Sequence, residues 1–187
     1  MKRTRLVQFA SAAAVLGVAG AGLYLRRTRP DVINPAVPEP ARTVSLDRYL
    51  GRWFEIARHE NRFEKGLEAV TADYALLPDG KIEVINGGRK GSPQGAPRTS
   101  RGRAIVVDTV SRAKLKVSFF GPLYTGDYWV LDHDDDYRWS IVGEPSGRYL
   151  WLLAREATPA PELVVELLDR AHALGYDRTR LKLTQQV

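Results

Sequence analysis

The sequence contains no cysteine among its 187 residues. This absence excludes disulfides, thiolate nucleophiles, cysteine-linked haem and cysteine-ligated zinc. It also excludes the acylated cysteine through which bacterial lipoproteins are anchored. No internal repeat is present either, and the length predicts one folded domain with appended segments rather than two large domains.

The chain also lacks a basic excess outside its N-terminus, although its formal net charge is +6. Residues 1–29 hold six basic and no acidic side chains, which leaves 22 basic and 22 acidic side chains in the remainder. Proteins that bind nucleic acids draw most of their non-specific affinity from neutralising phosphates. A neutral body therefore argues against nucleic acid as a partner.

A run of twenty residues from Leu6 to Leu25 carries no charge and is rich in alanine, valine, leucine and glycine. A helix of that length spans the hydrocarbon core of a membrane. Three interpretations stay open: an uncleaved anchor, a secretory signal cleaved near Ala19-Gly20-Ala21, or a buried soluble helix. Residues 1–29 are predicted to be a signal peptide or membrane anchor, and both of these imply export from the cytoplasm.

A proline-rich stretch follows, with Pro30, Pro35, Pro38 and Pro40 and few large apolar side chains. Such a composition is typical of an extended spacer. We therefore predict a linker over residues 30–43 and a folded domain over residues 44–187.

Short runs of β-branched and aromatic residues, separated by turn residues, predict an all-β fold. Eight antiparallel strands with one apolar face each either stack as a sandwich or close into a barrel, and we favour an eight-stranded up-and-down barrel that can hold one small ligand. Pro78-Asp79-Gly80 predicts a tight turn, and residues 88–100 a longer connection. The expected strands cover residues 53–58, 69–77, 81–87, 101–108, 113–120, 127–132, 138–143 and 149–155.

Beyond residue 155 the apolar residues recur at helical spacing. Thr158 is placed to cap this helix, Pro159 suits its first turn and Gly175 ends it. The strong apolar stripe predicts that the helix packs on the outer wall of the barrel. A short ninth strand is expected at about residues 179–185.

Three short motifs carry a resemblance to a known family. Gly51-Arg52-Trp53 resembles the Gly-x-Trp opening of the lipocalins, the turn from Asp134 to Tyr137 resembles a second motif of that family, and Arg155 ends the eighth expected strand as its basic residue does. The resemblance implies that Gly51, Trp53, Asp134, Tyr137 and Arg155 close the bottom of the barrel. A guanidinium stacked on an indole suits such a seal, because the contact gains roughly 0.5–2 kcal/mol.

The match is closer to the bacterial outer-membrane branch of this family, which also resembles apolipoprotein D. It rests on residues 62–68, 115–122 and 149–153, within a resemblance that covers about residues 44–186. It implies binding of a fatty acid, lysophospholipid or similar lipid, without a cofactor, outside the cytoplasm at the cell envelope. Since the lipid-anchoring cysteine of that branch is missing, we expect either attachment through the N-terminal segment or a periplasmic protein, with homodimerisation left open.

Alternation along the strands selects inward candidates for ligand binding, and two further aromatic residues are expected near the mouth. These candidates are Tyr74, Ile82, Val84, Val117, Phe119, Tyr128, Val130 and Trp139, with Phe63 and Tyr124 at the mouth.

The dispersed histidines show no metal-ligand spacing, and no catalytic set emerges. We predict a binding protein rather than an enzyme. The alternatives are a lipid-processing enzyme on the same barrel and an envelope protein that recruits a partner.

Overall fold

The structure is a computed structural model that describes residues 29–187. The chain divides into two units, Met1–Pro30 and Asp31–Val187, and the second contains the barrel. The predicted membrane segment over residues 6–25 lies outside the described residues. Among the residues that are described, no helix is long and apolar enough to cross a membrane.

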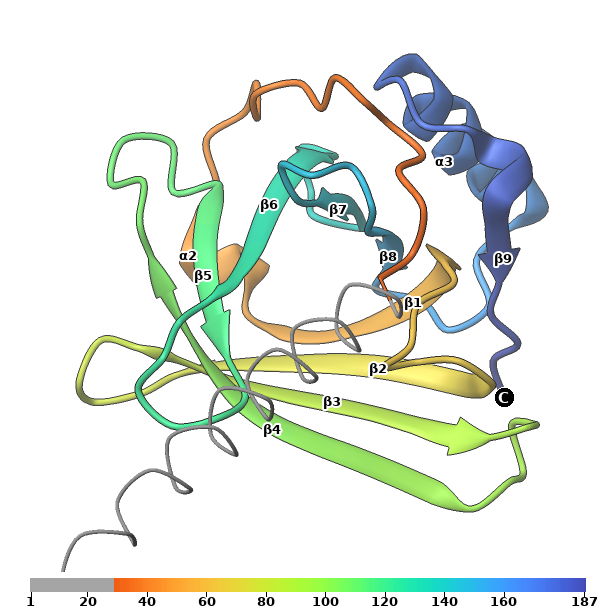
Figure 1. Ribbon diagram of the computed structural model, residues 1–187, viewed down its shortest axis with the longest axis horizontal. Helices are drawn as coiled ribbons and strands as arrows, with labels where there is room; N and C mark the ends of the chain where they lie inside the picture. The colour runs from red at the N-terminus through yellow and green to blue at the C-terminus, as the bar shows by residue number, and fades with distance from the viewer. Residues whose placement is uncertain (1–28) are drawn as a thin grey trace, which may run out of the picture. The chain divides into compact units, whose positions relative to one another are not determined.

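Eight antiparallel strands form a closed barrel (Figure 1), as the sequence predicts. Each strand pairs with its neighbour in the chain, and β1 closes the sheet by pairing with both β2 and β8. The strands are β1 Gly51–His59, β2 Leu67–Leu76, β3 Ile82–Lys90, β4 Pro97–Val106, β5 Lys114–Ser118, β6 Gly126–His133, β7 Trp139–Gly143 and β8 Leu150–Ala154.

The connections alternate between the two ends of the barrel. The loops β1–β2, β3–β4, β5–β6 and β7–β8 lie at one end, which we call the open end, and the N-terminus of β1 lies at the other, the closed end. The β2–β3 turn forms where predicted, with Gly80 at φ +79°. The predicted connection over residues 88–100 is shorter, because β3 and β4 stay paired out to Arg89 and Pro97.

A ninth strand, β9 Leu181–Leu183, pairs with the C-terminal end of β1, over Ala57–His59. There β1 separates from β2, since the two strands pair only over Gly51–Phe54 of β1. The C-terminal segment bridges this gap: Ala69 of β2 donates its backbone N–H to Gln185 at 2.7 Å. The short ninth strand thus completes the wall.

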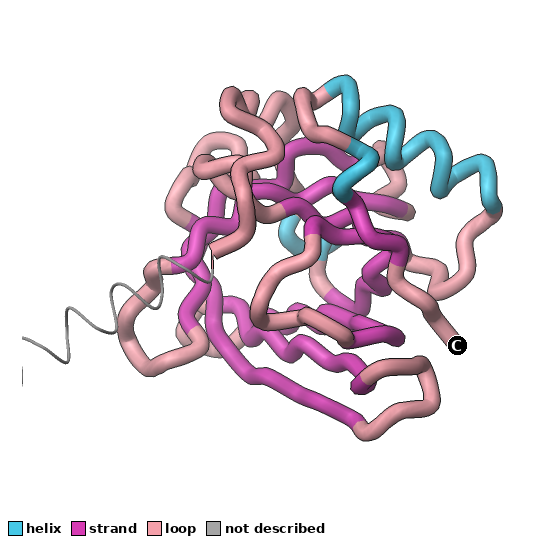
Figure 2. The backbone as a smooth tube through the Cα atoms, turned by 45° about the vertical axis from the view of Figure 1, so that its right-hand side comes forward, coloured by secondary structure: helices cyan, strands magenta, loops and turns pink. Residues whose placement is uncertain are grey.

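The helix α3 Pro161–Ala173 lies outside the barrel (Figures 1 and 2). Leu167 and Ala171 are fully buried against the outward side chains of β6, β7 and β8, in a cluster that includes Trp139 and Ile141. The helix begins two residues later than predicted, with Ala160 before it and no side-chain cap from Thr158. Pro161 rather than Pro159 occupies its first turn, where the missing N–H costs nothing.

The segment over residues 31–43 has no helix or strand, but it packs on the barrel along its course. Ile33 is buried in the outer cluster, and Asn34 donates from Nδ2 to the Leu174 carbonyl at 2.9 Å. Further on, the guanidinium of Arg42 donates to the His133 carbonyl at 2.6 Å. The predicted start of the folded domain at Val44 stays a prediction. Ile33, which precedes Val44, belongs to the buried cluster between the barrel and α3.

Candidate functional site

The closed end of the barrel is sealed by a tryptophan beneath an arginine. Trp53 is fully buried at the start of β1, and its indole nitrogen donates to the Tyr49 carbonyl at 2.8 Å. The guanidinium carbon of Arg155 lies 3.8 Å from the centre of the indole. The short helix α2 Leu46–Tyr49 crosses this end and packs the Tyr49 ring 5.1 Å from that of Trp53.

Arg155 also ties the closed end together by hydrogen bonds. Its Nη1 donates to the Arg52 carbonyl at 2.7 Å, and its Nη2 lies within 3.1 Å of the carbonyls of Arg48, Tyr49 and Leu50. The carbonyls of Arg48, Tyr49 and Leu50 lie at the C-terminal end of helix α2, where backbone acceptors have no partner within the helix. Gly51 has φ +94°, and an added Cβ would lie 3.4 Å from Arg155 Nη1. Glycine therefore allows the turn beneath the guanidinium.

The β6–β7 turn supports this seal from the side. Asp134 accepts from the Arg138 backbone at 2.5 Å and from the Arg138 Nε at 2.7 Å. Tyr137 takes a positive φ of 56°, and its hydroxyl accepts from the Ser45 N–H at 2.7 Å. The five residues assigned to barrel closure by resemblance thus lie at one end of the structure.

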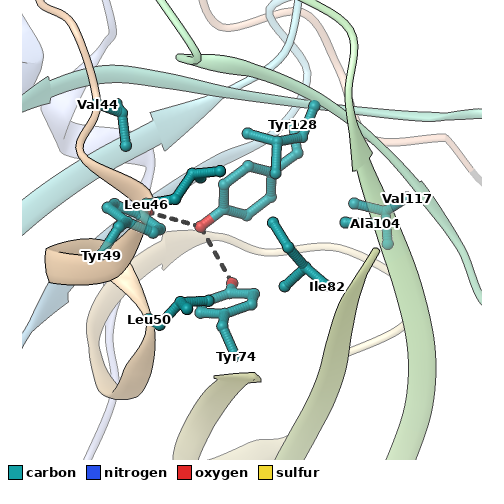
Figure 3. Close-up of a pocket in the computed structure, with 10 residues that line it drawn as sticks. Val44, Leu46, Tyr49, Leu50, Tyr74, Ile82, Ala104, Val117 and Tyr128 are labelled. Atoms are coloured by element: carbon teal, nitrogen blue, oxygen red, sulfur yellow. Dashed lines mark hydrogen bonds between the residues drawn. The ribbon is translucent and has the colours of Figure 1, made fainter. Parts of the chain in front are cut away.

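A cavity lies inside the barrel next to helix α2 (Figure 3). It has about 350 Å³ of empty space, counting the part that is open to solvent. Its wall consists of Val44, Leu46, Tyr49, Leu50, Tyr74, Ile82, Ala104, Leu115, Val117 and Tyr128.

Three tyrosine hydroxyls on this wall bond to one another rather than facing the empty space. Tyr74 donates to the Tyr128 hydroxyl at 3.0 Å, and the Tyr128 and Tyr49 hydroxyls lie 2.8 Å apart (Figure 3). Burial raises the pKa of Tyr49 to about 12 and raises those of Tyr74 and Tyr128 as well. The hydroxyls therefore stay neutral, and the cavity presents an apolar surface.

The structure separates the ten predicted ligand residues into groups. Tyr74, Ile82, Val117 and Tyr128 line the cavity. Val84 and Val130 are buried in the interior clusters but do not line it. Phe63 and Tyr124 lie in loops of the open end, and Phe63 is 62% exposed.

One predicted position is corrected, and one remains a prediction. Trp139 lies in the outer cluster beneath α3, with the Arg170 guanidinium carbon 4.6 Å from its ring centre, so it faces away from the cavity. Phe119 does not line the cavity. It follows the end of β5, is 38% exposed, and its ring lies against Gly102 of β4, on the same face of the strand as Ala104.

Six lining residues were not among the candidates. Val44, Leu46, Tyr49 and Leu50 come from the segment before β1, outside the expected strands. The apolar spacing of Leu46, Tyr49 and Leu50 is helical and could have identified them. Ala104 and Leu115 lie on strands beside predicted inward residues.

A charged cluster lies in the wall near the open end, where β1 and β9 meet. Arg58 is fully buried, and its Nη1 donates to Glu55 at 2.6 Å. Its Nη2 donates to the Glu64 and Leu67 carbonyls at 2.9 and 3.1 Å, and thereby fixes the β1–β2 loop. The Glu64 carboxylate accepts from the Trp151 indole at 2.8 Å.

Glu55 has an unusual environment within this cluster. Burial, together with the nearby Glu64 carboxylate, raises the pKa of Glu55 to about 7 against the attraction of Arg58. Its Oε2 has no hydrogen-bond partner among the described residues. A buried carboxyl with an incomplete set of partners is costly to ionise.

The acidic β6–β7 turn pairs with arginines. Asp136 of the turn lies 3.5 Å from Arg48, and Asp132, near the end of β6, lies 3.2 Å from Arg170. Over the described residues, no group of histidines and carboxylates is arranged to hold a metal ion.

A closed eight-stranded barrel with an apolar cavity, one tryptophan-sealed end and an external helix defines the lipocalin class. The family model of the lipocalin-like domain matches residues 44–186. The chain belongs to the lipocalin family.

Similar proteins occur in bacteria, plants and animals. The outer membrane lipoprotein Blc of Escherichia coli (strain K12) is 42% identical over 161 residues, which cover 83% of this chain and 90% of the relative. Temperature-induced lipocalin-1 of Arabidopsis thaliana is 39% identical over 160 residues, or 79% of this chain and 82% of the relative. Apolipoprotein D of Mus musculus is 30% identical over 175 residues, covering 89% of this chain and 90% of the relative.

Solved structures show the same fold at lower sequence identity. Insecticyanin from the tobacco hornworm Manduca sexta aligns with a TM-score of 0.62 and 20% identity, covering 85% of this chain and 86% of that structure. The likeness shows that the barrel architecture is shared.

Proposed function

We propose that this protein binds a single-chain lipid, such as a fatty acid or lysophospholipid, in the barrel cavity and carries it within the cell envelope. Its membership of the lipocalin family supports the binding of a small hydrophobic ligand. The observation that carries the finer proposal is the apolar cavity next to Tyr49, enclosed by the barrel and sealed below by Trp53 and Arg155.

The cavity wall favours entry of the apolar tail first. The ten lining residues include no charged side chain, and the tyrosine hydroxyls are paired with one another. A carboxylate or phosphate placed there would lose its hydration without gaining a partner, which is costly. The headgroup therefore stays near the open end, while the chain occupies the cavity.

The energetics of burial support useful affinity. Each buried methylene contributes about 0.8 kcal/mol, so a chain of about fourteen methylenes gains about 11 kcal/mol gross. Association costs of about 4–15 kcal/mol offset much of this gain. We expect micromolar to nanomolar binding that depends more on chain length than on headgroup.

The proposed location in the cell envelope is supported by the name of a bacterial relative and by the uncharged N-terminal segment. The relative from E. coli is named an outer membrane lipoprotein, and the uncharged segment over residues 6–25 is suited to export or anchoring. We propose an extracytoplasmic protein of the cell envelope, either held by this segment or released after its cleavage.

Titration of the protein with a fluorescent fatty acid tests the proposal. We expect saturable binding that Val117→Arg weakens by about tenfold or more, because an arginine on the cavity wall both fills space and must be desolvated. Val165→Arg is the matched control, since Val165 is 56% exposed on α3. Absence of saturable binding by any acyl ligand would refute lipid carriage.

Mass spectrometry of the ligand recovered after incubation separates carriage from catalysis. A carrier returns the lipid unchanged, whereas an enzyme built on the same barrel returns a product. Native mass spectrometry of the same sample reports the mature N-terminus and whether the protein is a monomer or a dimer.

A further inference from the structure

Large apolar side chains are exposed in the β5–β6 loop at the open end. Phe120 is 86% exposed and Leu123 is 70% exposed, next to Phe119 at 38%. Residues 119–125, which we call the mouth loop, contain no charged residue. Neighbouring exposed apolar side chains of this size are typical of an interaction surface.

The mouth loop is held in shape by the residue that precedes it. Ser118 is buried, and its hydroxyl donates to the Gly121 carbonyl at 2.9 Å. The same hydroxyl accepts from the Phe120 backbone N–H at 3.3 Å. These bonds fix the turn with Phe120 directed away from the protein, so the exposed ring does not result from an unstructured loop.

The strand beside this loop is strongly basic. Arg103 of β4 pairs directly with Ser118 of β5, which places Arg101 and Arg103 next to the mouth loop. From Val84 to Val107 the chain has five basic residues and no acidic residue. Glu83 contacts Arg101 at 3.6 Å, but 70% of the Arg101 side chain stays exposed.

The closed end differs in charge. Leu76 is exposed at the end of β2, and Val107 and Val110 are exposed in the β4–β5 loop around Asp108, which accepts from the Val110 N–H at 3.0 Å. The β4–β5 loop thus holds one acidic residue, Asp108, and one basic residue, Arg112, whereas only arginines flank the mouth loop on β4. Of these two loops, only the mouth loop combines an exposed aromatic side chain, Phe120, with arginines on the neighbouring strand.

We propose that the mouth loop and the flanking Arg101 and Arg103 dock the open end of the barrel onto an anionic lipid surface. Aromatic and leucine side chains insert at the boundary between headgroups and acyl chains. Basic residues close to an anionic surface add an attraction that salt weakens. Docking this end places the cavity entrance at the membrane, whether or not the cavity carries lipid.

Site-specific labelling of the full chain tests the proposal, because the sequence has no cysteine of its own. Leu123→Cys and Val110→Cys each receive one solvent-sensitive fluorophore; Val110 is the matched control, since it is 87% exposed at the opposite end. The labelled proteins are mixed with phosphatidylcholine vesicles, with or without phosphatidylglycerol, that carry a two-chain nitroxide lipid as quencher. The fluorophore reports on its own position, whereas total binding of the protein to the vesicle does not. Residues 6–25, if they insert, would hold every variant at the vesicle, docked or not.

We expect the label at position 123 to shift to the blue and to be quenched on phosphatidylglycerol vesicles, while the label at position 110 is unaffected. Arg101→Glu combined with Arg103→Glu should remove most of the quenching. Phe120→Ser should also remove most of it. Arg112→Glu, an exposed basic position in the β4–β5 loop, should leave it intact.

Several results would overturn the proposal. They are equal quenching at both labelled positions, no quenching at position 123, and quenching that does not depend on phosphatidylglycerol. A blue shift that grows with protein concentration without vesicles would assign the loop to a second copy of the chain. Loss of quenching when a lysophospholipid saturates the cavity would assign the signal to ligand uptake, which supports the proposed function but contradicts docking.

Discussion

Arg155 performs two tasks at the closed end that a different cation cannot combine. Its planar group stacks on Trp53, and its nitrogens donate to backbone carbonyls of both α2 and β1. We expect Arg155→Ala to lower the free energy of unfolding by about 2–4 kcal/mol, because backbone carbonyls lose their charged donor and the buried Trp53 loses its stacked guanidinium. Arg155→Lys should recover less than half of this, since an ammonium neither stacks as a plane nor reaches the acceptors together.

Chemical denaturation of the two variants measures this difference. Arg178→Ala is the control, because Arg178 is an exposed arginine that pairs with Asp169 on the surface. Equal stability of Arg155→Lys and the parent protein would show that charge alone, rather than the stacked plane, seals the barrel.

Glu55 makes stability depend on pH near neutrality. Since burial raises the pKa of Glu55 to about 7, the folded state binds this proton more tightly than the unfolded state, where the carboxyl has its ordinary pKa of 4.5. The resulting stabilisation is fully present below the unfolded pKa and is lost as the pH rises through the folded pKa. From about pH 5 to about pH 8, the parent protein should lose about 2 kcal/mol relative to Glu55→Gln.

Denaturation of both proteins across this pH range measures the change. Glu156→Gln removes an exposed carboxyl and serves as the control. A constant difference between the parent and Glu55→Gln would mean that Arg58 keeps Glu55 ionised throughout.

At the residue scale, the sequence predicts the seal better than the cavity. Trp53 and Arg155 belong to motifs of the family, whereas the inward residues depend on strand alternation. β7 is buried on both faces, because α3 covers its outer side, so Trp139 and Val142 are equally apolar. Alternation therefore cannot tell which face of β7 points into the barrel. The polar Ser140 marks that face, because its hydroxyl lies 3.2 Å from the Tyr49 hydroxyl.

At the scale of elements, α3 stabilises the barrel from outside. Leu167 is fully buried between the helix and the outer faces of β6, β7 and β8. Leu167→Ala should lower the free energy of unfolding by about 2–5 kcal/mol, the usual cost of a cavity in a packed core. Val165→Ala on the exposed side of the same helix should change it by about 0.5 kcal/mol or less.

Chemical denaturation monitored by tryptophan fluorescence checks the helix prediction, because Trp139 lies in the same cluster as Leu167. Similar losses for both variants would indicate that helix propensity, rather than burial of Leu167, governs stability.

The elements themselves follow from local sequence signals more closely than their junctions do. Alternation and turn residues predict the eight strands, and apolar residues at helical spacing predict the external helix. The packing of residues 31–43 gives no such signal, because prolines prevent periodicity and one buried apolar residue, Ile33, makes the main core contact. The bridging of β1 and β2 by β9 is likewise a matter of tertiary geometry, since the separation of two strands leaves no local pattern.

For the whole molecule, ligand binding and folding should be coupled. The cavity exists only in the closed barrel, so a ligand that fills it binds the folded state and not the unfolded chain. At about 100 times its dissociation constant, such a ligand adds about 2.7 kcal/mol to the free energy of unfolding. For a protein of this size the melting temperature should rise by about 5–10 °C.

Thermal denaturation with acyl chains of increasing length checks this coupling. The shift should grow with chain length until the cavity is filled, since each added methylene contributes only while it is buried. Val117→Arg should abolish the shift while Val165→Arg retains it, because only the first lines the cavity. A shift of equal size in both variants would place the lipid outside the barrel, on an apolar surface that α3 or the mouth loop provides.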